Sequence, residues 1–208
     1  MSAVRIDDLL KRYDGFVFDM DGTIVDSMPL HLAGWERASE IFNFHYNPDW
    51  FYNLGGVPSR KIAELIEKEQ QISLDIDAVT RAKSEYFLTV IDRVTPFPAM
   101  KTLIHELAAH CPLAIGTGSI RKNAETMLQH AGLRQYFQTL TTADDVVHHK
   151  PNPDTFLLSA AKMDLKPSNC LVFEDTEIGL ETAKNAGMDC VLIVNGEPDW
   201  NRYQVHRK

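Results

Sequence analysis

The chain is organised around the stretch Phe16-Val17-Phe18-Asp19-Met20-Asp21-Gly22-Thr23. Its apolar first half, with a glycine before it and another after it, predicts a short buried β-strand. Residues two apart in extended backbone point to the same side. Asp19 and Asp21 are therefore expected to face one small volume at the carboxyl end of that strand, where ligands bind in open α/β sheets.

This pair of carboxylates predicts metal-assisted phosphate chemistry. Two carboxylates held close together resist ionisation unless a cation joins them, and Mg²⁺ prefers oxygen ligands. A carboxylate attacks phosphorus without a base to activate it, so Asp19 is the predicted nucleophile. Asp21 is the predicted general acid and base. Gly22 allows a sharp turn that brings backbone N–H groups close to a phosphate. The alternative is an ordinary Met-Asp-Gly turn after a core strand, because short motifs also match by chance.

The composition is that of a globular protein, with 44% hydrophobic and 24% charged residues in a chain of 208. The formal net charge is −8, without a block of Lys and Arg, so we expect neither nucleic acid nor a membrane as partner. Cys111, Cys170 and Cys190 form no CxxC pair and predict free thiols. No apolar run has the length of a signal core or a membrane span, so we expect a cytoplasmic protein, a monomer or a weak dimer.

The periodicity of the chain changes near Pro96 and Pro98. Residues 27–94 show helical periodicity and no convincing strand, with Ser27 as a plausible helix cap and a turn-rich break at 43–49. Beyond the prolines, helical patterns alternate with short apolar runs. The predicted strands are 113–116, 139–142, 171–173 and 191–194, and the predicted helices are 100–109, 123–131, 153–163 and 178–186.

This alternation predicts an α/β fold, a Rossmann-like core with a mostly parallel sheet and helices on both faces. Residues 1–26 and 95–208 are expected to form the core domain. Residues 27–94 are expected to form an α-helical cap domain, inserted after the first strand and able to close over a substrate. The pattern of the tail, residues 195–208, predicts no element.

Three further motifs follow predicted strands. Thr117 and Gly118 lie in a small-residue turn whose hydroxyl and N–H groups suit phosphate oxygens, although plain helix capping has the same pattern. Lys150 lies in His149-Lys150-Pro151, where a cation would offset phosphate and carboxylate charge, although a single lysine is usually a solvated surface residue. Glu174 and Asp175 end an apolar run, where acids also favour a helix N-terminus.

The order and spacing of these four motifs resemble the haloacid dehalogenase superfamily, and Asp19 to Ser27 resembles its β-phosphoglucomutase-like branch. The resemblance implies that Asp19 becomes phosphorylated and Asp21 is the general acid and base. It implies that Thr117 and Lys150 bind the phosphate. It also implies that Glu174 and Asp175 hold Mg²⁺ together with the first pair, Asp175 directly and Glu174 directly or through water.

The cap is expected to select the substrate, because the core motifs contact only the phosphoryl group. His31 lies where the branch often has a histidine near the hinge, and Lys83 where its mutases carry a lysine. Arg60, in a loop similar to the branch's specificity loop but one residue longer, suits an oxygen-rich or second anionic group. A solvated or hinge-packing role is the alternative for all three residues.

The motif details look most like the fructose-1-phosphatase type of sugar phosphatase within this branch. The first hypothesis is therefore a Mg²⁺-dependent phosphatase that hydrolyses small hexose phosphates such as fructose 1-phosphate through an aspartyl phosphate. The alternative is a β-phosphoglucomutase that interconverts glucose 1-phosphate and glucose 6-phosphate. A dehalogenase would not use Mg²⁺, and a non-catalytic relative would be expected to lack one of the four groups.

Overall fold

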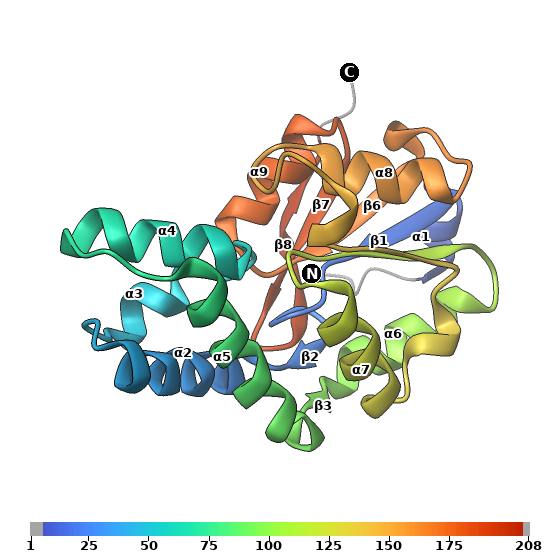
Figure 1. The fold of residues 1–208 in the computed structure, drawn as a ribbon. Coiled ribbons are helices and arrows are strands. Elements are labelled where there is room, and N and C mark those ends of the chain that lie inside the picture. Colours follow the sequence, from blue (N-terminus) through green and yellow to red (C-terminus); the bar gives the residue numbers. More distant parts are fainter. Residues whose placement is uncertain (1–5, 206–208) are drawn as a thin grey trace.

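A computed structural model describes residues 6–205 of the chain. In this part of the chain a six-stranded sheet has the order β5-β4-β1-β6-β7-β8, and its strands are parallel except for the last (Figure 1). The strands are β1 (Gly15–Phe18), β4 (Leu113–Gly116), β5 (Thr139–Thr141), β6 (Cys170–Glu174), β7 (Asp189–Val194) and β8 (Glu197–Gln204). The predicted α/β class and its parallel sheet are confirmed.

Strand β1 lies between β4 and β6, and all four of its residues are buried. Phe16 and Phe18 contribute to one hydrophobic cluster and Val17 to another, because successive side chains point to opposite faces of the sheet. Burial on both faces explains why this strand is a continuous apolar run. The carboxyl ends of β1, β4 and β6 consequently meet at one edge of the sheet.

Helices cover both faces of the sheet. The face of Phe16 packs against α1 (Ile6–Leu10), α6 (Pro98–Ala108) and α7 (Arg121–His130). The face of Val17 packs against α8 (Asp154–Lys162) and α9 (Glu177–Asn185). Short 3-10 turns complete the connections at Ile91–Arg93, Arg134–Tyr136, Ala143–Asp145 and Pro167–Asn169. The four helices predicted after residue 98 are present, with ends shifted by one or two residues.

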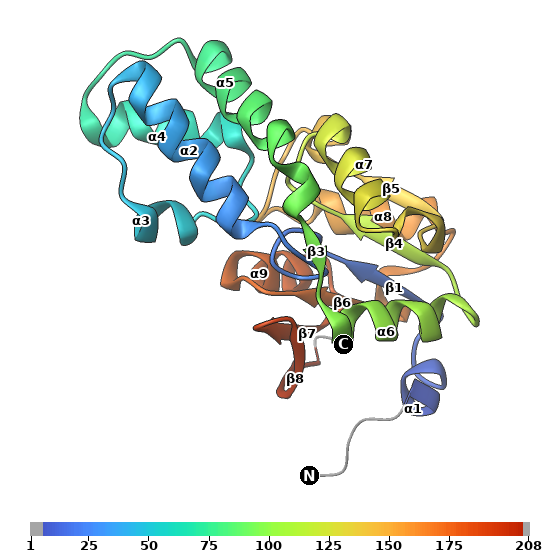
Figure 2. The ribbon, with the colours of Figure 1, turned by 90° about the horizontal axis from the view of Figure 1, so that it is seen from below.

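A block of four helices lies beside the sheet, at the edge where the strands carry the predicted site (Figure 2). It consists of α2 (Met28–Phe42), α3 (Pro48–Tyr52), α4 (Ser59–Gln70) and α5 (Ile76–Thr89). Trp35, Phe51 and Ile66 belong to its own hydrophobic core. Helix α3 falls at the end of the predicted turn-rich break, where the Asn47 side chain accepts hydrogen bonds from the backbone N–H groups of Asp49 and Trp50. The inserted helical cap predicted from the periodicity is therefore present.

Two very short strands join this block to the sheet. Strand β2 (Val25–Asp26) pairs antiparallel with β3 (Thr95–Pro96). Two residues are too few to leave a periodic signal in the sequence, so the pair was not predicted. It brings the entry to the helical block and the exit from it side by side.

The tail forms an edge strand that sequence analysis left unassigned. Strand β8 returns antiparallel to β7 through Asn195 and Gly196, whose φ angles are 52° and 76°. An Asn-Gly pair with both φ angles positive is the favoured two-residue hairpin turn, and this was the signal that could have predicted it. Trp200 of β8 packs edge-on against Phe173 of β6. Residues 1–5 and 206–208 of the predicted core domain lie outside the described residues.

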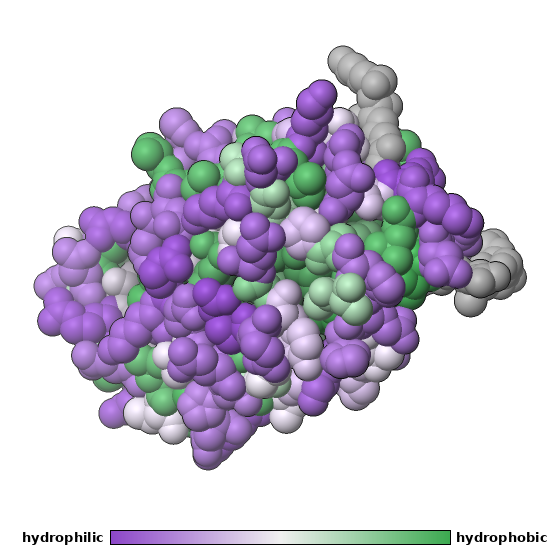
Figure 3. Space-filling model, turned by 90° about the vertical axis from the view of Figure 1, so that its right-hand side faces the viewer, coloured by the Kyte–Doolittle hydropathy of each residue, from purple (hydrophilic) through white to green (hydrophobic). Residues whose placement is uncertain are grey.

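The surface in Figure 3 is mainly hydrophilic, with groups of hydrophobic residues between the charged ones. Within residues 6–205, no helix combines the length and the hydropathy that a membrane span requires.

Candidate active site

Lys150 connects two carboxylates at the centre of the site. Its Nζ lies 2.7 Å from Oδ1 of Asp19 and 2.8 Å from Oε1 of Glu174. All three side chains are buried, and Asp19 follows β1 while Glu174 ends β6. Burial alone would lower the pKa of Lys150, but the two carboxylates raise it above its ordinary value. The lysine is thus a fixed positive charge, unlike the solvated surface lysine that was its alternative.

Asp19, Glu174 and Asp175 form an acidic group whose ligand oxygens all lie within 4.8 Å of one another. Burial raises the pKa of Asp19 well above its ordinary value, Lys150 opposes this, and the neighbouring carboxylates add to it. Burial and then Glu174 raise the pKa of Asp175 to about 7. Buried carboxylates that resist ionisation in each other's presence suit a hard divalent cation with oxygen ligands. The residues therefore fit the Mg²⁺ that the sequence predicted.

Two threonines hold the acids in place. Thr176 donates to Oε2 of Glu174 through its N–H at 2.6 Å and its hydroxyl at 2.8 Å. Thr23 donates to Oδ1 of Asp175 at 2.8 Å. Gly22, with a φ of 82°, leaves space for Asp175, because a Cβ there would lie 2.3 Å from Oδ2 of that residue. Neither threonine was among the predicted site residues, although Thr23 adjoins the first motif and Thr176 precedes a helix.

Asp21 makes its hydrogen bonds to residues outside this acidic group. Its carboxylate accepts hydrogen bonds from Ser27 at 2.6 Å and Ser119 at 2.8 Å, and its Oδ1 lies 2.7 Å from His31 Nε2. Burial alone would raise the pKa of Asp21, but His31 and the two serines hold it well below its ordinary value.

The Asp21 carboxylate is not a member of the group that could hold a metal. That Asp21 is a metal ligand beside Asp19 stays a prediction. Strand β1 ends at Phe18, so the rule that residues i and i+2 of a strand share a side does not extend to Asp19 and Asp21. Ser27 likewise makes no cap hydrogen bond at α2, because its hydroxyl donates to Asp21.

Thr117 and Gly118 lie directly after β4, at the same edge of the sheet. The Thr117 side chain is 1% exposed, and its hydroxyl oxygen accepts a hydrogen bond from the N–H of Ser119 at 3.0 Å. It also lies 3.4 Å from Oδ2 of Asp21, so this turn is joined to the first motif. A Cβ on Gly118 would lie 2.3 Å from the backbone oxygen of Gly56. The structure thus brings the predicted turn into the site, together with Ser119, which was not predicted.

Two of the three predicted cap residues extend the site from Asp21. His31 Nδ1 lies 2.7 Å from Nζ of Lys83, and the His31 ring stacks on Phe87 with centroids 4.4 Å apart. Burial and then Lys83 lower the pKa of His31, and burial lowers the pKa of Lys83 to about 8. A neutral ring that accepts from Lys83 at Nδ1 donates from Nε2 to Asp21. Asp21, His31 and Lys83 consequently form one hydrogen-bonded row.

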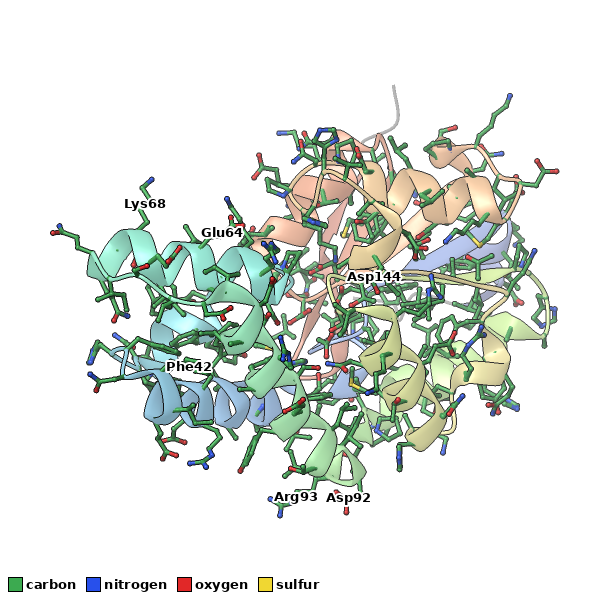
Figure 4. The ribbon with its side chains drawn as sticks, viewed as in Figure 1. Phe42, Glu64, Lys68, Asp92, Arg93 and Asp144 are labelled. Atoms are coloured by element: carbon green, nitrogen blue, oxygen red, sulfur yellow. The ribbon has the colours of Figure 1, made fainter. Side chains whose placement is uncertain are left out.

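Arg60 makes a different contact. Its guanidinium pairs with Asp77 at 2.5 Å, and both side chains are largely exposed. It lines a cavity of about 510 Å³ that opens between the helical block and the sheet. The cavity also contacts Asp21, Lys83 and Asp144, and Asp144 lies near the centre of Figure 4, where these two parts meet. The structure therefore brings Arg60 to the cavity but not into the row at Asp21.

Comparison with known proteins gives the family of the chain. The sequence profile of the haloacid dehalogenase-like hydrolases matches residues 16–193, which is most of the chain. The chain belongs to this family. Fructose-1-phosphate phosphatase YqaB of Escherichia coli (strain K12) is 41% identical over 186 residues, covering 89% of this chain and 98% of that protein. This confirms the predicted family and makes the protein a hydrolase.

The chain is also similar to two β-phosphoglucomutases. The β-phosphoglucomutase of Bacillus subtilis (strain 168) is 26% identical over 190 residues, covering 88% of this chain and 84% of that protein. A crystal structure of β-phosphoglucomutase from Clostridium difficile superposes with a TM-score of 0.80 at 23% identity, covering 88% of this chain and 85% of that one. The structural likeness supports the shared fold of sheet and helical cap.

Proposed function

We propose that this hydrolase is a Mg²⁺-dependent phosphatase that acts on small sugar phosphates, hexose phosphates such as fructose 1-phosphate among them, through an aspartyl phosphate. The observation that carries the proposal is the meeting of Asp19, Lys150, Glu174 and Asp175 at the carboxyl ends of β1 and β6. Asp21, two residues after Asp19, lines the adjacent cavity. The 41% identity to a fructose-1-phosphate phosphatase supports the choice of substrate class.

Asp19, Glu174 and Asp175 would hold the Mg²⁺, since their oxygens converge within 4.8 Å. When bound, such an ion would neutralise carboxylate and phosphate charge and so keep Asp19 ionised against the effect of burial. Lys150 is already in hydrogen-bond contact with Asp19, so it offsets charge that develops on the transferring phosphoryl group. Thr117 and the N–H group of Gly118 are proposed to hold the remaining phosphate oxygens.

In the first step a carboxylate oxygen of Asp19 bonds to phosphorus, and the bond from phosphorus to the sugar oxygen breaks. That oxygen takes a proton from Asp21. A bound phosphate dianion raises the pKa of Asp21 because like charges disfavour ionisation, so substrate binding moves this residue toward its acid form. In the second step Asp21 takes a proton from water as the water oxygen attacks phosphorus, which releases phosphate and restores Asp19.

The helical block is proposed to act as the cap domain over this chemistry, comprising residues 27–94, with residues 1–26 and 95–208 as the core domain. Strands β2 and β3 flank these limits and support them. His31, Arg60 and Lys83 would then bring cap groups to the substrate. A β-phosphoglucomutase is the second candidate, supported by the match to the Bacillus subtilis mutase. It differs in keeping water away from the phosphorylated Asp19.

The test is a panel of phosphorylated sugars assayed for phosphate release, with Mg²⁺ and with EDTA. We expect release from hexose phosphates in Mg²⁺ and almost none in EDTA. Asp19→Asn should lower turnover by at least about a thousandfold, because an amide is not a nucleophile toward phosphorus, while its circular dichroism spectrum stays unchanged. Activity retained in Asp19→Asn would disprove the assigned nucleophile. Conversion of β-glucose 1-phosphate with a bisphosphate primer, without phosphate release, would favour the mutase.

A further inference from the structure

A side-chain hydrogen bond joins the helical block to the sheet domain at the interface between them. Ser84 lies on α5 and Asn123 on α7. Nδ2 of Asn123 lies 3.0 Å from Oγ of Ser84, and Oδ1 lies 3.1 Å from the same oxygen. Asn123 is only 4% exposed, so water does not compete freely for its amide. We propose that this pair is a clasp that holds the cap closed over a bound sugar phosphate.

The position of the pair distinguishes it from the other contacts between cap and core. Within residues 6–205, two sets of side-chain hydrogen bonds join residues 27–94 to the rest of the chain. One set runs from Ser27 and His31 to Asp21, and the other joins Ser84 to Asn123. Ser27 and His31 belong to the start of α2, immediately after the short strand pair that connects the two parts. The Ser84–Asn123 bond instead ties a distant cap helix to the core.

A second contact shows that cap and core meet tightly in this structure. The loop before α4 places the backbone oxygen of Gly56 where a Cβ on Gly118 would be only 2.3 Å away. Such an approach is possible because neither residue has a side chain. The cap therefore contacts the core through the Gly56 loop and through α5. The contact through α5 is the hydrogen bond between Ser84 and Asn123.

The clasp acts on the chemistry through its neighbour in sequence. Lys83 precedes Ser84 and reaches His31, which contacts Asp21. Because α5 is a rigid helix, fixing Ser84 against α7 also fixes where Lys83 meets His31. Ser84 and Asn123 are thus positioning residues for the general acid and base. This inference rests on the proposed phosphatase function, since turnover of a sugar phosphate is its readout.

The experiment is a double-mutant cycle with Ser84→Ala, Asn123→Ala and the double variant. Kinetics are measured with fructose 1-phosphate and with p-nitrophenyl phosphate, whose leaving group needs little help from a general acid. We expect each single variant to lose about fivefold in kcat/KM for the sugar phosphate, and the double variant to lose no more than the worse single one. The loss with p-nitrophenyl phosphate should be smaller. Ser84→Thr, which keeps the hydroxyl, should restore the activity.

Thr89→Ala and Thr126→Ala are the matched controls. Each removes a hydroxyl from the same two helices, where it bonds only to its own helix backbone, at Tyr86 and Lys122. Their kcat/KM should equal that of the wild type. Thermal unfolding of every variant shows whether it is folded.

Losses that multiply in the double variant would overturn the clasp, because they indicate two independent roles such as separate contacts to the sugar. Single variants with wild-type kinetics would overturn it too. If the wild type hydrolyses neither ester, the proposed function fails. The clasp is then tested by itself, by measuring the hydrogen exchange of backbone amides. Amides of α5 should then exchange faster in both single variants than in Thr89→Ala, and equal exchange would refute the clasp.

Discussion

Lys83 is a cation in a position where burial disfavours charge. Its side chain is 4% exposed, and burial lowers its pKa to about 8. Gly34 provides part of the space, since a Cβ there would lie 3.1 Å from the Lys83 backbone oxygen and 3.4 Å from its side chain. A residue that costs stability at neutral pH is expected where function needs a proton or a charge.

The first prediction compares Lys83→Met with the wild type at two pH values. The folded pKa is about 8 and the ordinary value is 10.5, so between these values the unfolded chain binds the additional proton. The unfolding free energy of the wild type relative to Lys83→Met should therefore rise between pH 8 and pH 10.5, by on the order of 3 kcal/mol. Urea unfolding at both pH values measures it. Lys101→Met, at an exposed position, should show no such change.

Helix α9 holds part of the site at its first turn. Thr176 is its N-cap, and the Thr176 hydroxyl oxygen accepts a hydrogen bond from the N–H of Gly179 at 3.0 Å. The same hydroxyl donates to Glu174. Gly179 leaves space for Glu174, because a Cβ at position 179 would lie only 1.8 Å from the carboxylate carbon of Glu174. The start of the helix and the position of the acid are therefore fixed by one set of contacts.

The second prediction removes this cap. Thr176→Ala should lower the unfolding free energy by about 1 to 2 kcal/mol, because it deletes both an N-cap and a hydrogen bond to a buried carboxylate. Thr176→Ser keeps the hydroxyl, so its unfolding free energy should fall by only about a few tenths of a kcal/mol. Chemical denaturation of the three proteins gives the comparison. Equal losses in the two variants would mean that the methyl group and not the hydroxyl carries the effect.

Across the whole molecule, three acids from separate segments converge on one small volume. Asp19 follows β1 while Glu174 and Asp175 close β6, and the parallel pairing of these strands brings them together. Without a cation the raised pKa of Asp175, about 7, means that the folded state binds a proton more tightly than the unfolded chain does. Raising the pH through 7 therefore destabilises the metal-free fold through this group.

The third prediction follows for metal binding. Mg²⁺ at a hundredfold excess over its Kd should raise the unfolding free energy by about 2.7 kcal/mol, because it binds only the folded state. At one fixed Mg²⁺ concentration the gain should be larger at pH 8 than at pH 6, since protons compete for the carboxylates and raise the Kd. Thermal unfolding with Mg²⁺ and with EDTA measures it. Asp175→Asn should lose most of the gain and Asp164→Asn, at an exposed position, none. An equal gain in both variants would contradict the site.

The sequence alone predicts the parallel sheet, the inserted helices and the convergence of Asp19, Thr117, Lys150 and the acids at 174 and 175. Buried strands and amphipathic helices leave periodic patterns, and parallel strands align their carboxyl ends. The sequence did not determine the direction of Asp21, which local patterns place beside Asp19. Packing sets that direction. Ser27 and His31 lie 6 and 10 residues after Asp21 and Ser119 lies 98 residues after it, and the three donors meet at one carboxylate only in the folded chain. The same reason applies to the hydrogen bond between Ser84 and Asn123 and to the position of β8 in the sheet. Side chains that are distant in sequence come into contact only when the chain folds.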